Sequence, residues 1–226
     1  MKPSSFLSQT KLTPDASQHF LRLANEFAAI WASAGLNLKP TRTGEPTEFN
    51  RASEATKRVA TGYLEFNLAA LREMIASGES LKDTKTYLWR AIRKLNVVPP
   101  SDCMTYINDS DIVEIYFIDD IQIFRNFRFL EITSFTIDEM LCRPWYRNTG
   151  RPWTTQLAVF RMAFRIKIGQ IRKPTLWNIP EHELYEKDTE GCVRFRTQLK
   201  HVIPLFQQSS VIAVISTNSS HVISHR

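Results

Sequence analysis

Four aspartates, Asp109, Asp111, Asp119 and Asp120, lie within a short stretch near the middle of the chain. Neighbouring carboxylates can serve as a general acid and base or bind a divalent cation. Aspartates in turns also accept hydrogen bonds from their own backbone. Because Asp119 and Asp120 separate two short runs of β-branched and aromatic residues, we interpret them as a solvated hairpin turn.

The other residues that could take part in chemistry stand alone in the sequence. The three cysteines, Cys103, Cys142 and Cys192, form no CxxC pair and have no histidine at ligand spacing. They indicate neither a zinc site nor a disulfide framework, and their number is typical of a reducing compartment. Glycine-rich nucleotide loops, a nucleophile elbow and an HExxH motif are also missing from the sequence. The sequence therefore predicts a protein without enzymatic activity, metal or cofactor.

Basic residues gather on two expected helices of a chain whose formal net charge is +6 and whose pI is near 9.3. Within 153–172, Arg161 and Arg165 are four residues apart and share a helix face, where they could contact an anionic ligand or an acidic partner. The alternative is the solvated side of an amphipathic helix. An earlier helix carries basic side chains that could contact phosphate or face water: Lys82, Lys85, Arg90, Arg93 and Lys94.

Residues 1–98 are predicted to form a helical region, because apolar positions recur every three or four residues. We expect three amphipathic helices, which end near Gly35, Ala76 and Leu95. They carry more large apolar side chains than three short helices can bury among themselves, so a homodimer is expected. The residues that motivate this expectation are Phe20, Phe27, Trp31, Tyr63, Phe66, Tyr87 and Trp89.

The pattern changes at Pro99-Pro100, so we expect a second domain over 99–226. Runs of β-branched and aromatic residues predict five strands in an α+β domain. The predicted strands cover 111–118, 121–127, 175–179, 195–206 and 211–217.

Helices are expected between the second and third strands. A helix of barely two turns begins after Thr136, and Glu139 completes a capping box with it. Pro144 ends this helix because it lacks the backbone donor that the next turn needs. A longer helix follows over 153–172.

A two-strand hairpin, a group of helices and a closing three-strand meander resemble the PAS fold, in which a clasp of helices covers one face of five antiparallel strands. The segment IQIFRNFRFLEITSFTIDEMLCRPW is similar to the family's passage from the second strand into the clasp. Asn126 stands at the asparagine that ends the strand, and Arg143-Pro144 stands at the end of the acidic helix. KHVIPLFQQSSVIAVIST resembles the family's closing hairpin.

The sequence departs from the family pattern at specific positions. Ser134 and Cys142 stand where the family has glycine, and Thr217-Asn218-Ser219 replaces its closing Asp-Ile-Thr. Cys142 lies outside the Asn-Cys-Arg-Phe motif of the light-sensing relatives, and 153–172 lack the axial histidine of the haem-binding ones. Neither flavin nor haem is therefore expected.

The resemblance implies a non-enzymatic sensory or protein-interaction module of a cytoplasmic, bacterial signalling pathway, which acts in trans on a protein partner. It also implies a cup that either binds a small molecule or is filled by aromatic rings. The other function considered is a basic, nucleic-acid-associated transcriptional regulator that uses its N-terminal helices. No membrane association is expected, because no apolar run is long enough. The candidate ligand-binding residues are Trp145, Phe160, Arg161, Phe164, Arg165, Trp177 and His201.

Overall fold

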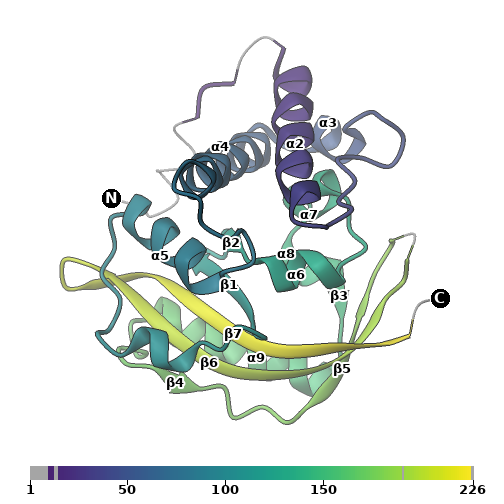
Figure 1. Cartoon of the computed structure of the whole chain (residues 1–226). Helices are drawn as coiled ribbons and strands as arrows, with labels where there is room; N and C mark the ends of the chain where they lie inside the picture. Colours follow the sequence, from purple (N-terminus) through teal and green to yellow (C-terminus); the bar gives the residue numbers. More distant parts are fainter. Residues whose placement is uncertain (1–9, 13–14, 190, 225–226) are drawn as a thin grey trace.

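The computed structural model describes residues 10–12, 15–189 and 191–224. The outer ends of both expected units, residues 1–9 and 225–226, lie outside the described residues. Figure 1 shows an N-terminal group of helices above a curled antiparallel sheet whose last two strands are long. The chain is therefore a mixed helix and sheet protein, as the sequence predicts.

The three long helices of the N-terminal region match the apolar periodicity. They are α2 (Ala16–Ser33), α4 (Glu54–Ala76) and α5 (Thr84–Lys94), with the short helix α3 (Thr47–Arg51) between the first two. Ser53 caps α4 and Asp83 caps α5, because each side chain accepts a hydrogen bond from a backbone N–H of the first turn. Local sequence signals thus set where these helices start.

Short helices follow the first hairpin, as expected. They are α6 (Phe127–Ile132), α7 (Ile137–Cys142) and α8 (Trp145–Asn148), and the longer α9 (Trp153–Lys167) comes after them. The capping box of α7 is confirmed, since the Thr136 hydroxyl accepts from the Glu139 N–H at 3.3 Å and the Glu139 carboxylate accepts from the Thr136 N–H at 3.0 Å. Helix α9 ends earlier than predicted, because Gly169 takes a positive φ of 72°.

The sheet contains seven strands rather than the expected five. The path is β2-β1-β7-β6-β5-β3, and β4 pairs with β6 outside it. The bounds are β1 (Ile112–Phe117), β2 (Gln122–Arg125), β3 (Thr149–Gly150), β4 (Thr175–Leu176), β5 (His182–Glu186), β6 (Arg194–Gln207) and β7 (Ser210–Ser224).

The first strand of the closing meander is β5, and this corrects the sequence expectation. Residues 175–179 were expected to be that strand, but only Thr175 and Leu176 pair with β6. Strand β5 reads HELYE, and its charged residues hide the strand from a search for apolar runs. The final hairpin is confirmed, because Gln207 pairs with Ser210 across a two-residue turn.

Helices cover both faces of the sheet. One face packs against the N-terminal helices, with Ile115, Leu205 and Ile215 in the same hydrophobic cluster as Phe27 and Trp31. The other face packs against α9, with Val202 and Val214 in a second cluster. The alternation of side chains along each strand sends neighbouring residues to opposite faces. The helical region and the sheet therefore share one core.

This shared core removes the reason for which dimerisation was expected. Six of the seven large side chains that motivated it are buried within the chain, at 0–6% exposure, and only Trp89, at 47%, is exposed. The N-terminal helices bury them against each other and against the sheet, which supplies the surface that a second copy was expected to provide. A dimer through these side chains is therefore not required.

Candidate functional site

A cavity of about 170 Å³ lies between the sheet and the helices α6, α8 and α9. An apolar cavity of about 150 Å³ holds a benzene molecule in another protein, so this one has room for a single aromatic ring. Its apolar wall includes both tryptophans that the sequence singled out. The main apolar side chains that line it are Ile112, Phe129, Phe135, Trp145, Val159, Ile166, Trp177, Phe195 and Val214.

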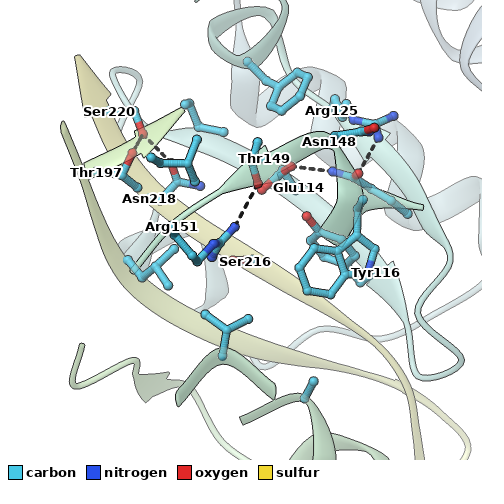
Figure 2. A pocket seen from close by; sticks show the side chains of 18 of the residues that line it. Glu114, Tyr116, Arg125, Asn148, Thr149, Arg151, Thr197, Ser216, Asn218 and Ser220 are labelled. Atoms are coloured by element: carbon cyan, nitrogen blue, oxygen red, sulfur yellow. Dashed lines mark hydrogen bonds between the residues drawn. The ribbon is translucent and has the colours of Figure 1, made fainter. Parts of the chain in front are cut away.

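A row of polar side chains crosses the sheet at this cavity. Arg125 on β2 pairs directly with Glu114 on β1, and Glu114 pairs with Ser216 on β7. Residues paired across antiparallel strands point to the same face, so the three side chains reach the cavity together. Figure 2 shows Glu114, Arg125 and Ser216 around the same space.

Glu114 and Arg125 are joined through Gln122. The Gln122 amide donates to the Glu114 carboxylate, and the Arg125 Nη2 donates to the Gln122 side-chain oxygen and, at 3.3 Å, to the Met140 carbonyl. Burial raises the pKa of Glu114, although the charge of Arg125 acts in the opposite direction. The carboxylate is thus held in a setting that disfavours its charge.

The Arg125 guanidinium lies between two aromatic rings. It is 5.5 Å from the centroid of Tyr63 on α4 and 5.2 Å from that of Phe129 on α6. Arg125 is only 3% exposed, and Nε and Nη1 have no hydrogen-bond partner. A second cavity, of about 270 Å³, lies on the α4 side and is also lined by Arg125 and Trp145. Arg125 therefore connects the ligand-sized cavity to the N-terminal helices.

A second arginine, Arg151, reaches the same cavity from the segment after β3. Its Nη2 donates to the Thr149 hydroxyl at 3.3 Å, and its Nε has no partner. Burial lowers the pKa of Arg151, but a guanidinium remains charged in proteins. Gly150 beside it pairs with Tyr185, whose ring would lie 2.2 Å from a Cβ at position 150. A side chain at position 150 would therefore have to displace the half-exposed Tyr185 ring.

The opposite end of the cavity is polar but neutral. The Thr197 and Ser220 hydroxyls are 2.8 Å apart, and Ser220 donates to the Asn218 side-chain oxygen at 3.0 Å. These groups satisfy one another. The charged end, with Glu114, Arg125 and Arg151, is the chemically distinctive part of the cavity.

The candidate residues from the sequence divide into three groups. Trp145 and Trp177 line the cavity. Phe160, Arg161, Phe164 and Arg165 lie on the exposed side of α9 and do not line it. His201 lies beside Tyr106, with ring centroids 5.0 Å apart, and also does not line it.

The sequence analysis missed the charged residues of the cavity. Glu114 interrupts the apolar run of β1, and Arg125 follows two apolar residues at the end of β2. A charged residue within a strand that is buried on both faces is the signal that could have singled them out. Arg151 carries no such signal, because it follows a glycine in an irregular segment.

Within the described part of the chain, no three acidic, histidine or cysteine side chains gather closely enough to hold a metal ion. None of the described helices is long and apolar enough to cross a membrane. A comparison with protein-family models found no match, and neither did a search of curated proteins.

Proposed function

We propose that this chain is a non-enzymatic, PAS-like sensory module that binds a small molecule in the cavity and signals to a protein partner through α9. The proposal rests on the sequence resemblance and on the order of the elements. The hairpin β1-β2 comes first, α6 to α9 follow, and β5, β6 and β7 close the sheet beside β1. Strands β3 and β4 are additions to the five-stranded arrangement that the resemblance implies.

The single observation that carries the proposal is a chain of aromatic contacts from the cavity to the surface. Tyr116 and Trp145 line the cavity, and their ring centroids are 5.8 Å apart. Trp145 also lies 6.4 Å from Phe160, which is 45% exposed on the outer side of α9. A molecule that displaces Trp145 would therefore move a surface residue. That coupling is what a sensor requires.

The outer side of α9 exposes an apolar stripe. Its residues recur every three or four positions: Trp153, Leu157, Phe160, Phe164 and Ile168. A continuous exposed patch of large apolar side chains is typical of a protein interaction site. Arg161 and Arg165 lie along the stripe and are exposed, so the complementary partner is an apolar surface with acidic residues at its edge.

The nucleic-acid alternative loses two of its basic side chains on α5 to ion pairs. Arg90 binds Glu73 and Glu79, and Lys94 binds Glu73. These ion pairs neutralise two of the five basic side chains that could contact phosphate or face water, and Lys82, Lys85 and Arg93 are the other three. Retention on heparin with a salt titration tests this alternative, since phosphate contacts weaken steeply as salt rises.

The cytoplasmic location remains part of the proposal. All three cysteines are free in the structure. Free thiols persist in reducing compartments, where disulfides are rare.

The ligand-binding half of the proposal is tested with indole, a neutral probe slightly larger than benzene. Binding to the full chain, followed by nuclear magnetic resonance, is expected in the wild type. It is expected to be lost in Ala163→Phe, since Ala163 lines the cavity and a phenyl ring would fill it. Leu157→Phe adds a ring on the outer side of the same helix and should leave binding unchanged. Equal binding by all three proteins would contradict the proposal.

Coupling to α9 is tested by hydrogen exchange. Saturation with indole should change the exchange of amides in 153–167 of the wild type. Trp145→Leu should still bind indole but show a much smaller change, because the ring contact with Phe160 is gone. An unchanged α9 in the wild type would contradict the coupling.

The partner surface is tested with a helical peptide that carries leucines on one face and glutamates on the others. It should bind the wild type and bind Phe164→Ser weakly. Trp89→Ser removes another exposed aromatic side chain, on α5, and should have no effect. A peptide with lysine in place of glutamate should not bind. If light scattering instead shows a dimer that Phe164→Ser dissociates, the stripe binds a second copy and the acidic partner is refuted.

A further inference from the structure

We infer that the cavity takes a small aryl carboxylate, a molecule with an apolar body of about one aromatic ring and a carboxylate that binds at Arg125 and Arg151. This inference rests on the proposed ligand-binding function and adds the chemical class of the ligand. It is argued from the unpartnered polar atoms of the residues that line the cavity, from its two arginines and from its size.

The polar atoms of the cavity are short of hydrogen-bond acceptors. Six buried side-chain atoms of its lining residues have no partner within the described structure. Five of them are N–H donors, and the exception is the Asn148 Oδ1. The donors are Arg125 Nε, Arg125 Nη1, Trp145 Nε1, Arg151 Nε and Trp177 Nε1.

Buried donors of this kind are costly unless a partner satisfies them. Leaving one unpaired destabilises the folded protein, and a charged group does so more strongly than a neutral one. Arg125 and Trp177 are 3% and 8% exposed, so bulk water does not solvate them freely. A carboxylate offers only acceptors, about four lone-pair sites on two oxygens, and it matches this deficit. An amine would add donors where donors are already in excess.

Neither arginine of the cavity is hydrogen-bonded to a carboxylate within the described residues; their acceptors are the Gln122 side chain, the Met140 carbonyl and the Thr149 hydroxyl. Of its lining residues, five are charged: Asp120, Arg151, Glu186, Arg125 and Glu114. Asp120 is paired with Lys167 on α9. Glu186 accepts from the Thr133 hydroxyl at 2.7 Å and from the Ser134 N–H at 3.0 Å.

The two remaining cations then face one carboxylate, Glu114. That carboxylate already accepts from Gln122, and it forms no direct ion pair with Arg125 because Gln122 lies between them. Arg151 has the Thr149 hydroxyl as its polar contact. Both guanidinium groups therefore bind only neutral acceptors, and the carboxylate of a ligand would supply the anionic partner that each lacks. Charge-assisted hydrogen bonds to arginine are also the strongest that the ligand could form.

The size and the apolar lining of the cavity determine the rest of the ligand. The volume of about 170 Å³ accommodates one ring with a short substituent. Trp145 and Trp177 provide aromatic faces against which such a ring can pack. The Asn148 Oδ1 could accept one hydrogen bond from a hydroxyl or N–H group on the same ligand.

The test uses three probes with the same body, 3-phenylpropionate, 3-phenylpropanol and 3-phenylpropylamine, titrated calorimetrically into the full chain at about pH 7. The carboxylate is expected to bind roughly tenfold or more tightly than the alcohol, since a hydrogen bond to a charged group is worth about 1.5–3 kcal/mol. The amine is expected not to bind. Phenyl phosphate serves as a further probe, and tighter binding of phosphate than of carboxylate would overturn the carboxylate assignment.

Substitutions test whether Arg151 and Glu114 determine the preference for the carboxylate over the alcohol. Arg151→Met should weaken binding of the carboxylate roughly tenfold and leave binding of the alcohol unchanged. The preference for the carboxylate would then be lost. Glu114→Gln should raise the affinity for the carboxylate severalfold, because it removes a like charge from the cavity. The new amide can still accept the hydrogen bond from Gln122. Arg161→Met, on the outer side of α9, is the matched control and should change neither affinity. If Arg151→Met does not fold, Arg151→Lys keeps the charge and should retain a reduced preference.

The outcomes separate this inference from the proposed function. Equal affinity for alcohol and carboxylate, or equal weakening of both by Arg151→Met, would overturn the carboxylate assignment and leave ligand binding intact. Failure of every probe, the neutral alcohol and indole included, would overturn both.

Discussion

Asn126 provides the sharpest test of how the helical region is attached to the sheet. Its side chain is fully buried, and Oδ1 accepts from the Val113 N–H at 3.0 Å and from the Phe129 N–H at 3.3 Å. Its Nδ2 donates to the Asp111 carbonyl at 2.8 Å and to the Thr84 hydroxyl at 2.9 Å. One amide thus caps α6, holds the start of β1 and binds the first residue of α5.

Asn126→Ala should destabilise the protein by about 3–5 kcal/mol. The Val113 N–H and the Asp111 carbonyl would each lose this buried partner at a cost of about 1–3 kcal/mol. Loss of the N-cap of α6 adds about 1 kcal/mol. Because these terms share one side chain, we take a value below their largest sum. A small domain is stable by about 5–15 kcal/mol, so a large fraction of the total is at stake.

Equilibrium unfolding in urea, with linear extrapolation to water, measures this effect. Asn25→Ala is the matched control, because Asn25 is exposed on α2 and its amide contacts only the Leu21 carbonyl of its own helix. The control should change stability by no more than about 0.5 kcal/mol. A loss below about 1 kcal/mol for Asn126→Ala, with an unchanged urea dependence, would refute the role assigned to this amide.

Three further predictions follow from burial. Residues 99–226 alone should show no cooperative thermal transition by circular dichroism, since the sheet loses the helices with which it shares a core; a sharp transition would support two separable units. The raised pKa of Glu114 means that the stability it contributes is present below its usual pKa of about 4.5 and is lost as pH rises through the folded pKa. The stability of Glu114→Gln relative to the wild type should therefore grow as pH rises above about 4.5; a difference that does not vary with pH would contradict this. Burial raises the pKa of the Cys103 thiol to about 11, so its reaction with a disulfide reagent at about pH 8 should be slow until urea opens the protein; fast labelling of Cys103 in the native state, located by peptide mapping, would be the contrary result.

Local signals were enough to predict much of the secondary structure. The capping box at Thr136, the stop at Pro144 and the two-residue turn after Gln207 act within a few residues, so the sequence states them directly. The apolar periods placed α2, α4 and α5 and the strands β1, β2, β6 and β7. Strand β5 was missed because its alternation is carried by charged residues and one leucine.

The candidate site was predicted only in its aromatic part. Trp145 and Trp177 stood out as large rings near the clasp, and they do line the cavity. The expectation that Arg161 and Arg165 contact an anionic ligand came from helix periodicity, which identifies a shared face but not whether that face points toward the sheet or toward water. The structure places these arginines outside the cavity and brings in Arg125 and Arg151 instead.

What the sequence determined by itself is therefore most of the elements, and the ends that caps and prolines mark, because hydrogen bonds and steric limits within a few residues fix them. What only the tertiary structure decided is which surfaces meet. The register of β1 and β2 places Glu114 opposite Arg125. Arg151 lies 26 residues after Arg125 in the sequence and lines the same cavity. The N-terminal helices bury six of the seven aromatic side chains that suggested a dimer within the chain, against each other and against the sheet. Such contacts depend on the packing of the whole chain, and burial energy does not distinguish one apolar partner from another until the shapes are known.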